Sequence, residues 1–227
     1  MIPIQNIYYM LSYAFQILNE QGYKNIATEQ FNNTAELMAA ILEKGIAIQL
    51  KRGLGKEYIP QTEALSSLRG KIDIAESIKT QSMLRKQLIC TYDEFSVNSI
   101  MNRIIKSTIE ILLRSNISKQ RKKNLRKLML YFSEVDFIDL YTVNWNVQYN
   151  RNNQTYRMLI SICYLVVKGL LQTQSDGSTK LMDFLDEQRM CRLYEKFILE
   201  YYRREFKNQI TANASQIPWQ LDNDENS

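Results

Sequence analysis

The chain has 227 residues, of which 45% are hydrophobic and 23% charged, and its 7 glycines and 3 prolines are too few for a largely disordered protein. The net charge of +5 and the pI near 9.0 allow a nucleic-acid partner without requiring one. The absence of histidine excludes every mechanism that needs an imidazole base, nucleophile activator or metal ligand within this chain.

Cysteine spacing and apolar runs bear on the cell compartment. The 3 cysteines, Cys90, Cys163 and Cys191, are odd in number and widely separated, which favours reduced thiols over a disulfide framework or a zinc site. No apolar run approaches the ~20 residues that cross a bilayer, and the N-terminus lacks a basic region followed by an apolar signal segment. We therefore expect a cytoplasmic protein with no metal site of its own and no membrane partner.

The first half of the chain predicts both helices and strands. Apolar residues recur at helical spacing over residues 6–19 and 34–50. Residues 57–73 alternate in polarity, which predicts short strands or a hairpin. A short helix over 74–86 and a further strand over 87–95 complete this mixed region.

The second half predicts helices joined by polar segments. Apolar faces at helical spacing indicate helices over residues 98–114, 119–132, 156–171 and 186–207. The third of these is apolar on nearly all sides and is therefore expected to be deeply buried. Residues 172–180, rich in Ser, Thr, Gln and Gly, are the best candidate for a linker.

One segment is strongly basic. Six positive charges fall in one turn and helix, at Lys119, Arg121, Lys122, Lys123, Arg126 and Lys127. Clustered cations bind nucleic acid because they release condensed counterions when they neutralise phosphates. The other interpretation is a solvated helix face, since an apolar stripe in the same helix can pack on the protein.

Tyrosine is abundant, with 14 residues, and several cluster near the two ends of the chain. The clusters are Tyr8, Tyr9 and Tyr13 near the start and Tyr194, Tyr201 and Tyr202 on the last predicted helix. Their helical spacing favours ordinary packing over stacking on nucleic-acid bases.

Acidic residues of the last helix are weak candidates for metal-dependent phosphodiester chemistry. Glu205 and Lys207 have the E-x-K spacing, but on a helix the two side chains point about 200° apart, so we interpret this motif as fortuitous. Glu195 is the better candidate for an accessory acid, although an exposed charge without a catalytic role is its ordinary interpretation. No glycine-rich phosphate loop is present, so the chain is not expected to hydrolyse nucleotide by itself.

Four ordered blocks resemble the McrC family, the nuclease subunit of the McrBC 5-methylcytosine-specific restriction system. The most specific is IPIxNIYYMLxYA at residues 2–14. The second block comprises RGL at 52–54, YxPxTE at 58–63 and GKID at 70–73, and the third is NRIIKST at 102–108. The fourth contains DF at 183–184, LYxKF at 193–197 and RRE at 203–205.

The resemblance implies a two-part protein. An N-terminal docking domain, residues 1–175, is expected to bind and stimulate an McrB-like GTP-hydrolysing ring protein, which binds the GTP and reads methylated cytosine. Residues 176–227 are expected to begin an incomplete nuclease domain of the PD-(D/E)xK type. In the family, Mg²⁺ serves the complete nuclease domain, and the catalytic Asp and D-x-K strands follow the helix that resembles residues 186–207; those strands have no counterpart here.

We therefore predict an α+β fold, predominantly α-helical with a few short strands. The predicted function is that of an McrC-like subunit of a GTP-dependent, 5-methylcytosine-dependent restriction endonuclease, with no cofactor held in this chain and with DNA engaged mainly through the complex. The alternative is a non-catalytic nucleic-acid-binding adaptor that uses the basic helix.

Overall fold

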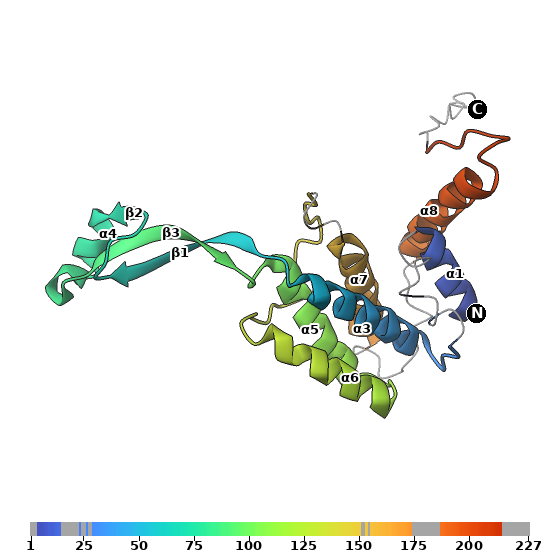
Figure 1. The fold of residues 1–227 in the computed structure, drawn as a ribbon, viewed down its shortest axis with the longest axis horizontal. Helices are drawn as coiled ribbons and strands as arrows, with labels where there is room; N and C mark the ends of the chain where they lie inside the picture. Colours follow the sequence, from blue (N-terminus) through green and yellow to red (C-terminus); the bar gives the residue numbers. More distant parts are fainter. Residues whose placement is uncertain are drawn as a thin grey trace, which may run out of the picture.

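The computed structural model describes residues 4–14, 23, 26, 29–150, 153, 155–173 and 187–214. Figure 1 shows three parts arranged in a row: a long arm of β-strands, a body of packed helices, and a helix pair at the end away from the arm. The helix pair consists of α1 (Ile4–Ala14) and α8 (Glu187–Glu205).

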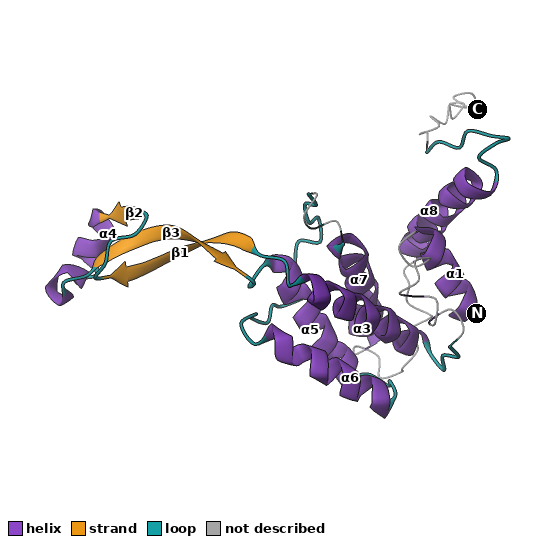
Figure 2. Cartoon of the chain, viewed as in Figure 1, coloured by secondary structure: helices purple, strands orange, loops and turns teal. Residues whose placement is uncertain are grey.

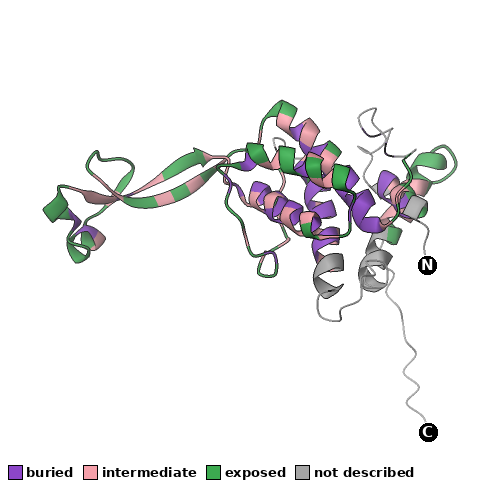
Figure 3. Ribbon diagram, turned by 90° about the horizontal axis from the view of Figure 1, so that it is seen from below, coloured by how far each residue is buried: buried purple, intermediate pink, exposed green. Residues whose placement is uncertain are grey.

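The helical body contains most of the buried apolar residues. It is built from α3 (Thr34–Arg52), α5 (Ile100–Arg114), α6 (Lys119–Met129) and α7 (Tyr156–Thr173). In Figure 3 the buried residues concentrate in these helices, whereas the arm is mostly exposed or half-buried. The hydrophobic effect that stabilises the fold therefore acts mainly in the body.

Side-chain caps and one glycine explain how the body helices begin and pack. Asn33 accepts a hydrogen bond of 2.8 Å from the Glu36 amide at the start of α3, and Ser99 caps α5 in the same way. Gly45 lets α3 approach α7 closely, because a Cβ at this position would lie 2.4 Å from Leu159 Cδ2.

The arm is a three-stranded antiparallel sheet (Figure 2). Its strands are β1 (Glu57–Leu65), β2 (Lys71–Asp73) and β3 (Leu88–Ser96), in the order β1-β3-β2. The pairing of β1 with β3 runs from Glu57 opposite Ser96 to Leu65 opposite Leu88. Nine residues of extended chain give the arm a length of about 30 Å.

The tip of the arm corrects one prediction. The helix predicted over residues 74–86 ends early: α4 spans Ile74–Lys79, and a separate 3-10 turn follows at Ser82–Arg85. Gln81 and Lys86, on either side of that turn, have φ of 52° and 56°. These left-handed conformations interrupt a right-handed helix, and non-glycine residues adopt them in isolated turns.

The other elements agree closely with the sequence. The mixture of helices with a small sheet is confirmed, as are the strands in 57–73 and 87–95 and the helices over 34–50 and 98–114. The helix predicted over 119–132 is α-helical to Met129 and ends in a 3-10 turn.

Three sequence predictions can be compared only with the residues that the structure describes. The predicted helix over 6–19 is described as far as Ala14. Of the predicted linker 172–180, the first two residues still belong to α7, and the remainder lies outside the described residues. Among the helices that the structure does describe, none is both long and apolar enough to cross a bilayer.

Candidate functional site: the arm, the basic helix and the α1–α8 pair

A buried hydrogen-bond cluster fixes the root of the arm to the helical body. The Asn102 amide nitrogen, on α5, donates to the carbonyl of Gly55 at 2.9 Å and to that of Val97 at 2.7 Å, so it joins the chain entering β1 to the chain leaving β3. Tyr156 of α7 donates from its hydroxyl to Asn102 Oδ1 at 2.7 Å and accepts from the Gly55 amide at 2.7 Å. Both strands of the arm are thereby held to two helices.

The environment of this cluster makes its hydrogen bonds energetically important. The Asn102 side chain is fully buried and Tyr156 is 1% exposed, so water does not compete for these groups. Burial raises the pKa of Tyr156, while the bonds from Gly55 and to Asn102 act in the opposite direction. We call Asn102, Tyr156, Gly55 and Val97 the root cluster.

The far end of the arm exposes large apolar side chains. The group comprises Leu68, Ile74, Ile78, Met83 and Leu84, which are 53% to 81% exposed. Among the described residues, a single sheet with only a short helix and a turn forms this end, and no second layer packs on it (Figure 2). A concentration of exposed apolar surface is typical of a protein interaction site. We call these five residues the apolar tip.

The six predicted basic residues do not lie in one environment. Arg121 turns toward α3, where its guanidinium forms ion pairs with Glu36 and Glu43 at 3.3 and 2.8 Å, and it also pairs at 2.5 Å with Glu29, which precedes α3. The Arg121 side chain is only 13% exposed. Burial lowers the pKa of Arg121, but Glu43, Glu29 and Glu36 raise it by more, so it lies above its ordinary value. Arg121 therefore fixes α6 to the body.

The other five basic residues lie on the outer side of α6. Lys119, Lys123, Arg126 and Lys127 are exposed and Lys122 is half-buried. Leu125 is fully buried on the opposite side of the helix, where α6 packs against α3 and α5. Helix α6 is thus amphipathic, as the sequence predicted. Arg121 faces the body, and the other five cations lie on the solvent side.

The acidic candidates on α8 lie apart from one another. Glu195 is exposed, and Glu205 ends α8 and accepts a hydrogen bond of 2.9 Å from Tyr13 on α1. Lys207 follows in the turn after the helix. Within the ranges that the structure describes, no three Asp, Glu, His or Cys side chains gather as metal ligands.

Aromatic side chains join the first and last helices. The Tyr13 ring lies 5.6 Å from that of Phe197 and 5.5 Å from that of Tyr201, centroid to centroid, and the Arg204 guanidinium lies over it. A hydrogen bond from Tyr9, burial and the bond to Glu205 together raise the pKa of the Tyr13 hydroxyl. Tyr13 and Tyr201 thus pack between the two helices, whereas Tyr9, Tyr194 and Tyr202 are 41% to 53% exposed.

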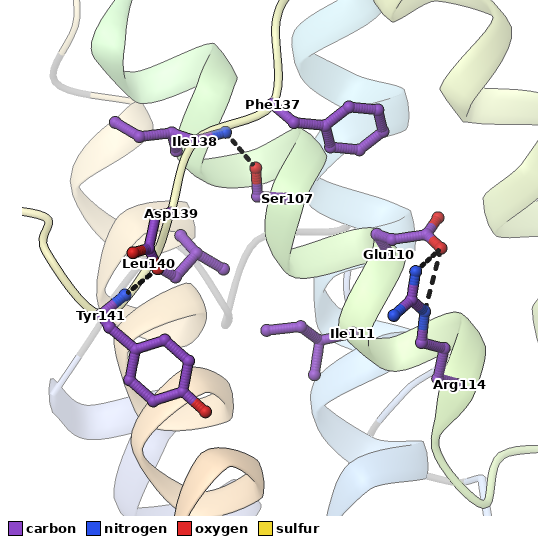
Figure 4. Close-up of a pocket in the computed structure, with 9 residues that line it drawn as sticks. All are labelled: Ser107, Glu110, Ile111, Arg114, Phe137, Ile138, Asp139, Leu140 and Tyr141. Atoms are coloured by element: carbon purple, nitrogen blue, oxygen red, sulfur yellow. Dashed lines mark hydrogen bonds and ion pairs between the residues drawn. The ribbon is translucent and has the colours of Figure 1, made fainter.

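A shallow pocket lies beside α5. Its volume is about 290 Å³, and Figure 4 shows it between α5 and the segment carrying Phe137 and Tyr141. Ser107 Oγ accepts a hydrogen bond of 2.9 Å from the Ile138 amide at its wall. At its edge Glu110 and Arg114 pair with each other at 3.0 Å, and the Asp139 carboxylate accepts a hydrogen bond of 2.9 Å from the Tyr141 amide.

Sequence reasoning missed the root cluster. Asn102 belongs to the NRIIKST block, but its position one turn inside an amphipathic helix shows nothing of its partners, which lie 47 residues before and 54 residues after it. The apolar tip had a weaker signal, because its apolar residues fall within the predicted strands and short helix, and local periodicity does not show that no other element covers them.

Comparison with known proteins adds three results. A family model described as McrBC 5-methylcytosine restriction system component matches residues 5–225. The type IV methyl-directed restriction enzyme EcoKMcrBC of Escherichia coli K12 is 30% identical over 221 residues, which are 96% of this chain and 63% of that protein. This chain thus spans somewhat less than two thirds of that relative.

Solved structures from Thermococcus gammatolerans share the fold. A chain of its McrBC complex superposes with a TM-score of 0.59 at 22% identity, over 89% of this chain and 58% of that one. A chain in an assembly of McrB AAA+ hexamers with bound McrC gives 0.58 at 22% identity, over 89% and 46%. The resemblance predicted from the four sequence blocks is confirmed: the chain is an McrC-like member of the family of McrBC 5-methylcytosine restriction system components.

Proposed function

We propose that this chain is the docking subunit of a GTP-dependent, 5-methylcytosine-dependent restriction endonuclease. Its partner is a GTP-hydrolysing ring protein of the McrB type, which holds the GTP and whose hydrolysis the chain stimulates. One similar structure contains McrB AAA+ hexamers with bound McrC, which supports a ring as the partner. The observation that carries the proposal is the arm with its apolar tip.

The arm suits docking for two physical reasons. Its apolar tip offers surface whose removal from water stabilises a complex. The root cluster holds the arm in one direction before binding, so less conformational freedom is lost on association. A rigid element that ends in apolar residues can thus bind a partner at a distance from the helical body.

The first experiment changes the apolar tip. The double variant Ile78→Asp/Leu84→Asp places two charges on side chains that are 63% and 81% exposed. Because both are exposed, folding should be preserved while co-elution with the ring protein and the increase in its GTP turnover are lost. Size-exclusion chromatography and a GTPase assay on purified components measure both effects.

The matched control lies on the helical body. Leu130→Asp/Tyr131→Asp introduces the same charges at side chains that are 76% and 66% exposed. This control should bind and stimulate like the wild type. Equal behaviour of the two double variants, whether both bind or both fail, would remove the arm from the proposal.

We further propose that residues 1–175 form the docking domain and that α8 begins a nuclease domain of the PD-(D/E)xK type. The family resemblance supports this division, with Mg²⁺ serving the complete nuclease domain. In the family that the chain resembles, the metal-binding strands follow the helix that resembles α8, so we expect the chain alone to leave methylated plasmid intact in Mg²⁺. Cleavage that requires Glu205 and Lys207 would contradict this proposal and our interpretation of the E-x-K motif.

Glu195 is proposed as an accessory acid of the complete nuclease. Its exposed position on α8 leaves it available to residues or substrate outside the described part of the chain. In a complete assembly with ring protein, GTP and Mg²⁺, Glu195→Gln should slow cleavage of methylated DNA while leaving GTP turnover unchanged. Cleavage by this variant at the wild-type rate would show that Glu195 is a surface charge without a catalytic role.

A further inference from the structure

The outer face of α6 is a cationic surface that the fold does not use. Helix rotation of about 100° per residue places Lys119, Lys122, Lys123, Arg126 and Lys127 within an arc of about 140°. We call these five residues the cationic face. Arg121 and Leu125, which anchor α6, lie on the opposite side of the helix.

The anchoring contacts fix which way the cationic face points. Arg121 holds three glutamates, and the neighbouring Asn124 donates a hydrogen bond of 2.9 Å to Glu43 on α3. Ser118, the N-cap of α6, donates from its amide and its hydroxyl to the two carboxylate oxygens of Glu36, at 2.7 and 2.9 Å. With these groups facing the body, rotation of α6 about its axis would break all of them.

Within the described part of the chain, no side chain of the cationic face forms an ion pair or a hydrogen bond. Elsewhere, Lys79, Arg114 and Arg203 each have a glutamate partner on the same helix. The carboxylates nearest α6 are already bound to Arg121, Ser118 and Asn124. Among the residues that the structure describes, none therefore neutralises the positive charge of the outer face.

This arrangement costs helix stability. Lys119 and Lys123, Lys122 and Arg126, and Lys123 and Lys127 are pairs of like charge four residues apart, which repel each other on a helix. The first turn of α6 also carries cations where the helix dipole favours anions. Arg126 and Lys127, in the last turn, interact favourably with the helix dipole, but the three like-charge pairs remain, and a bound polyanion would relieve their repulsion.

We propose that the cationic face binds the sugar-phosphate backbone of duplex DNA. The eight residue steps from Lys119 to Lys127 span about 12 Å of helix. Phosphates of one strand succeed each other about every 3.4 Å along the duplex axis, so about three to four lie within that span. Regularly spaced charge of this sign and extent complements duplex DNA, and flexible lysines suit contacts that carry no base information.

The cationic face and the apolar tip are separate surfaces. Figure 1 shows α6 along one edge of the helical body, whereas the arm leaves the body where its strands meet α3 and α5. DNA bound to α6 would leave the tip free. The proposal therefore does not depend on docking to the ring protein and is tested on this chain alone.

The test removes four charges of the cationic face. The quadruple variant Lys122→Gln/Lys123→Gln/Arg126→Gln/Lys127→Gln replaces each cation by a neutral polar side chain and leaves Arg121 in place. Duplex binding is measured by fluorescence anisotropy across a salt series, on methylated and unmethylated duplexes of one sequence. Each lost phosphate contact lowers the slope of log affinity against log salt by ~0.9, so four contacts lower it by up to ~3.6.

The control removes the same charge elsewhere. Lys51, Arg52, Lys71 and Arg85 are all exposed and lie outside α6, and their change to Gln gives the same net charge. The cationic-face variant should weaken binding about tenfold or more, equally on both duplexes, while the control changes it much less. The double variants Lys122→Gln/Lys123→Gln and Arg126→Gln/Lys127→Gln, each with about half the slope change, keep the test informative if the quadruple variant fails to fold.

Three outcomes overturn the proposal. A wild-type salt slope near zero shows that the chain does not bind phosphates. Equal losses in the variant and the control show that net charge alone acts, without a defined surface. Loss of binding to the ring protein with unchanged DNA binding assigns the cationic face to an acidic protein partner instead.

Discussion

Truncation of Asn102 should detach the arm from the helical body. Asn102→Ala removes a fully buried amide and leaves the Gly55 carbonyl, the Val97 carbonyl and the Tyr156 hydroxyl each without one partner. A buried polar group that loses its partner costs about 1 to 3 kcal/mol. Because the two carbonyls are only partly buried and water can reach them, we expect the free energy of unfolding to fall by about 3 kcal/mol.

Urea unfolding followed by circular dichroism measures this loss, and hydrogen exchange locates it. A loss of about 3 kcal/mol lowers the urea midpoint by about 1 to 3 M, since the unfolding free energy of small proteins falls by about 1 to 3 kcal/mol per molar urea. Amides at the two ends of the arm beside the body should exchange faster, whereas those of α4 should keep their protection. Tyr156→Phe, which removes the other side of the cluster, should be strongly non-additive with Asn102→Ala.

Asn98→Ala is the matched control, one turn before Asn102. Asn98 also uses both ends of its side-chain amide. Its nitrogen donates to the Asp136 carboxylate at 2.5 Å, and its oxygen accepts from the Asp136 backbone amide at 2.8 Å, but both bonds are exposed to water. Its truncation should cost about 1 kcal/mol or less. A loss below about 1 kcal/mol for Asn102→Ala, or unchanged exchange at the arm root, would refute the view that the root cluster holds the arm.

Two further predictions concern the body. Arg121→Met should lower the unfolding free energy by about 3 kcal/mol, because it leaves three clustered glutamates without their cation. Arg121→Lys should restore only part of this stability. A wild-type urea midpoint for the methionine variant would contradict the ion-pair network. Burial raises the pKa of the Cys163 thiol from 9.0 to about 12, so unfolding should become easier as the pH rises from 9 toward 12, where the unfolded chain loses the thiol proton first. Cys163→Ala should flatten this alkaline decline measured by urea unfolding, and an identical pH profile would contradict the assignment.

Local sequence patterns predicted the helices and strands well, because apolar periodicity and caps act over a few residues. The same helical spacing could have distinguished Arg121 from its five basic neighbours, since Arg121 shares a face with Leu125. The early end of α4 could not be anticipated, because Gln81 and Lys86 adopt left-handed conformations without a glycine to mark them.

Long-range arrangement was the part that the sequence left open. Alternating polarity indicated strands between 57 and 95, but nothing local shows that they leave the body as an arm. That geometry depends on Asn102 meeting Gly55 and Tyr156, which are distant in the chain. The proposed sites likewise depend on which charges find partners, as the ion pairs of Arg121 illustrate.

The contact between α1 and α8 sets an order of events during synthesis. Tyr13 and Glu205, which form a hydrogen bond, are 192 residues apart. At about 5 to 20 residues per second, the ribosome needs about 10 to 40 s to make that intervening chain. Throughout that interval α8 does not cover the aromatic side of α1, so these aromatic side chains stay exposed on the nascent chain. Helix α1 thus completes these contacts only once α8 has been made, and until then chaperones that recognise aromatic segments can bind it.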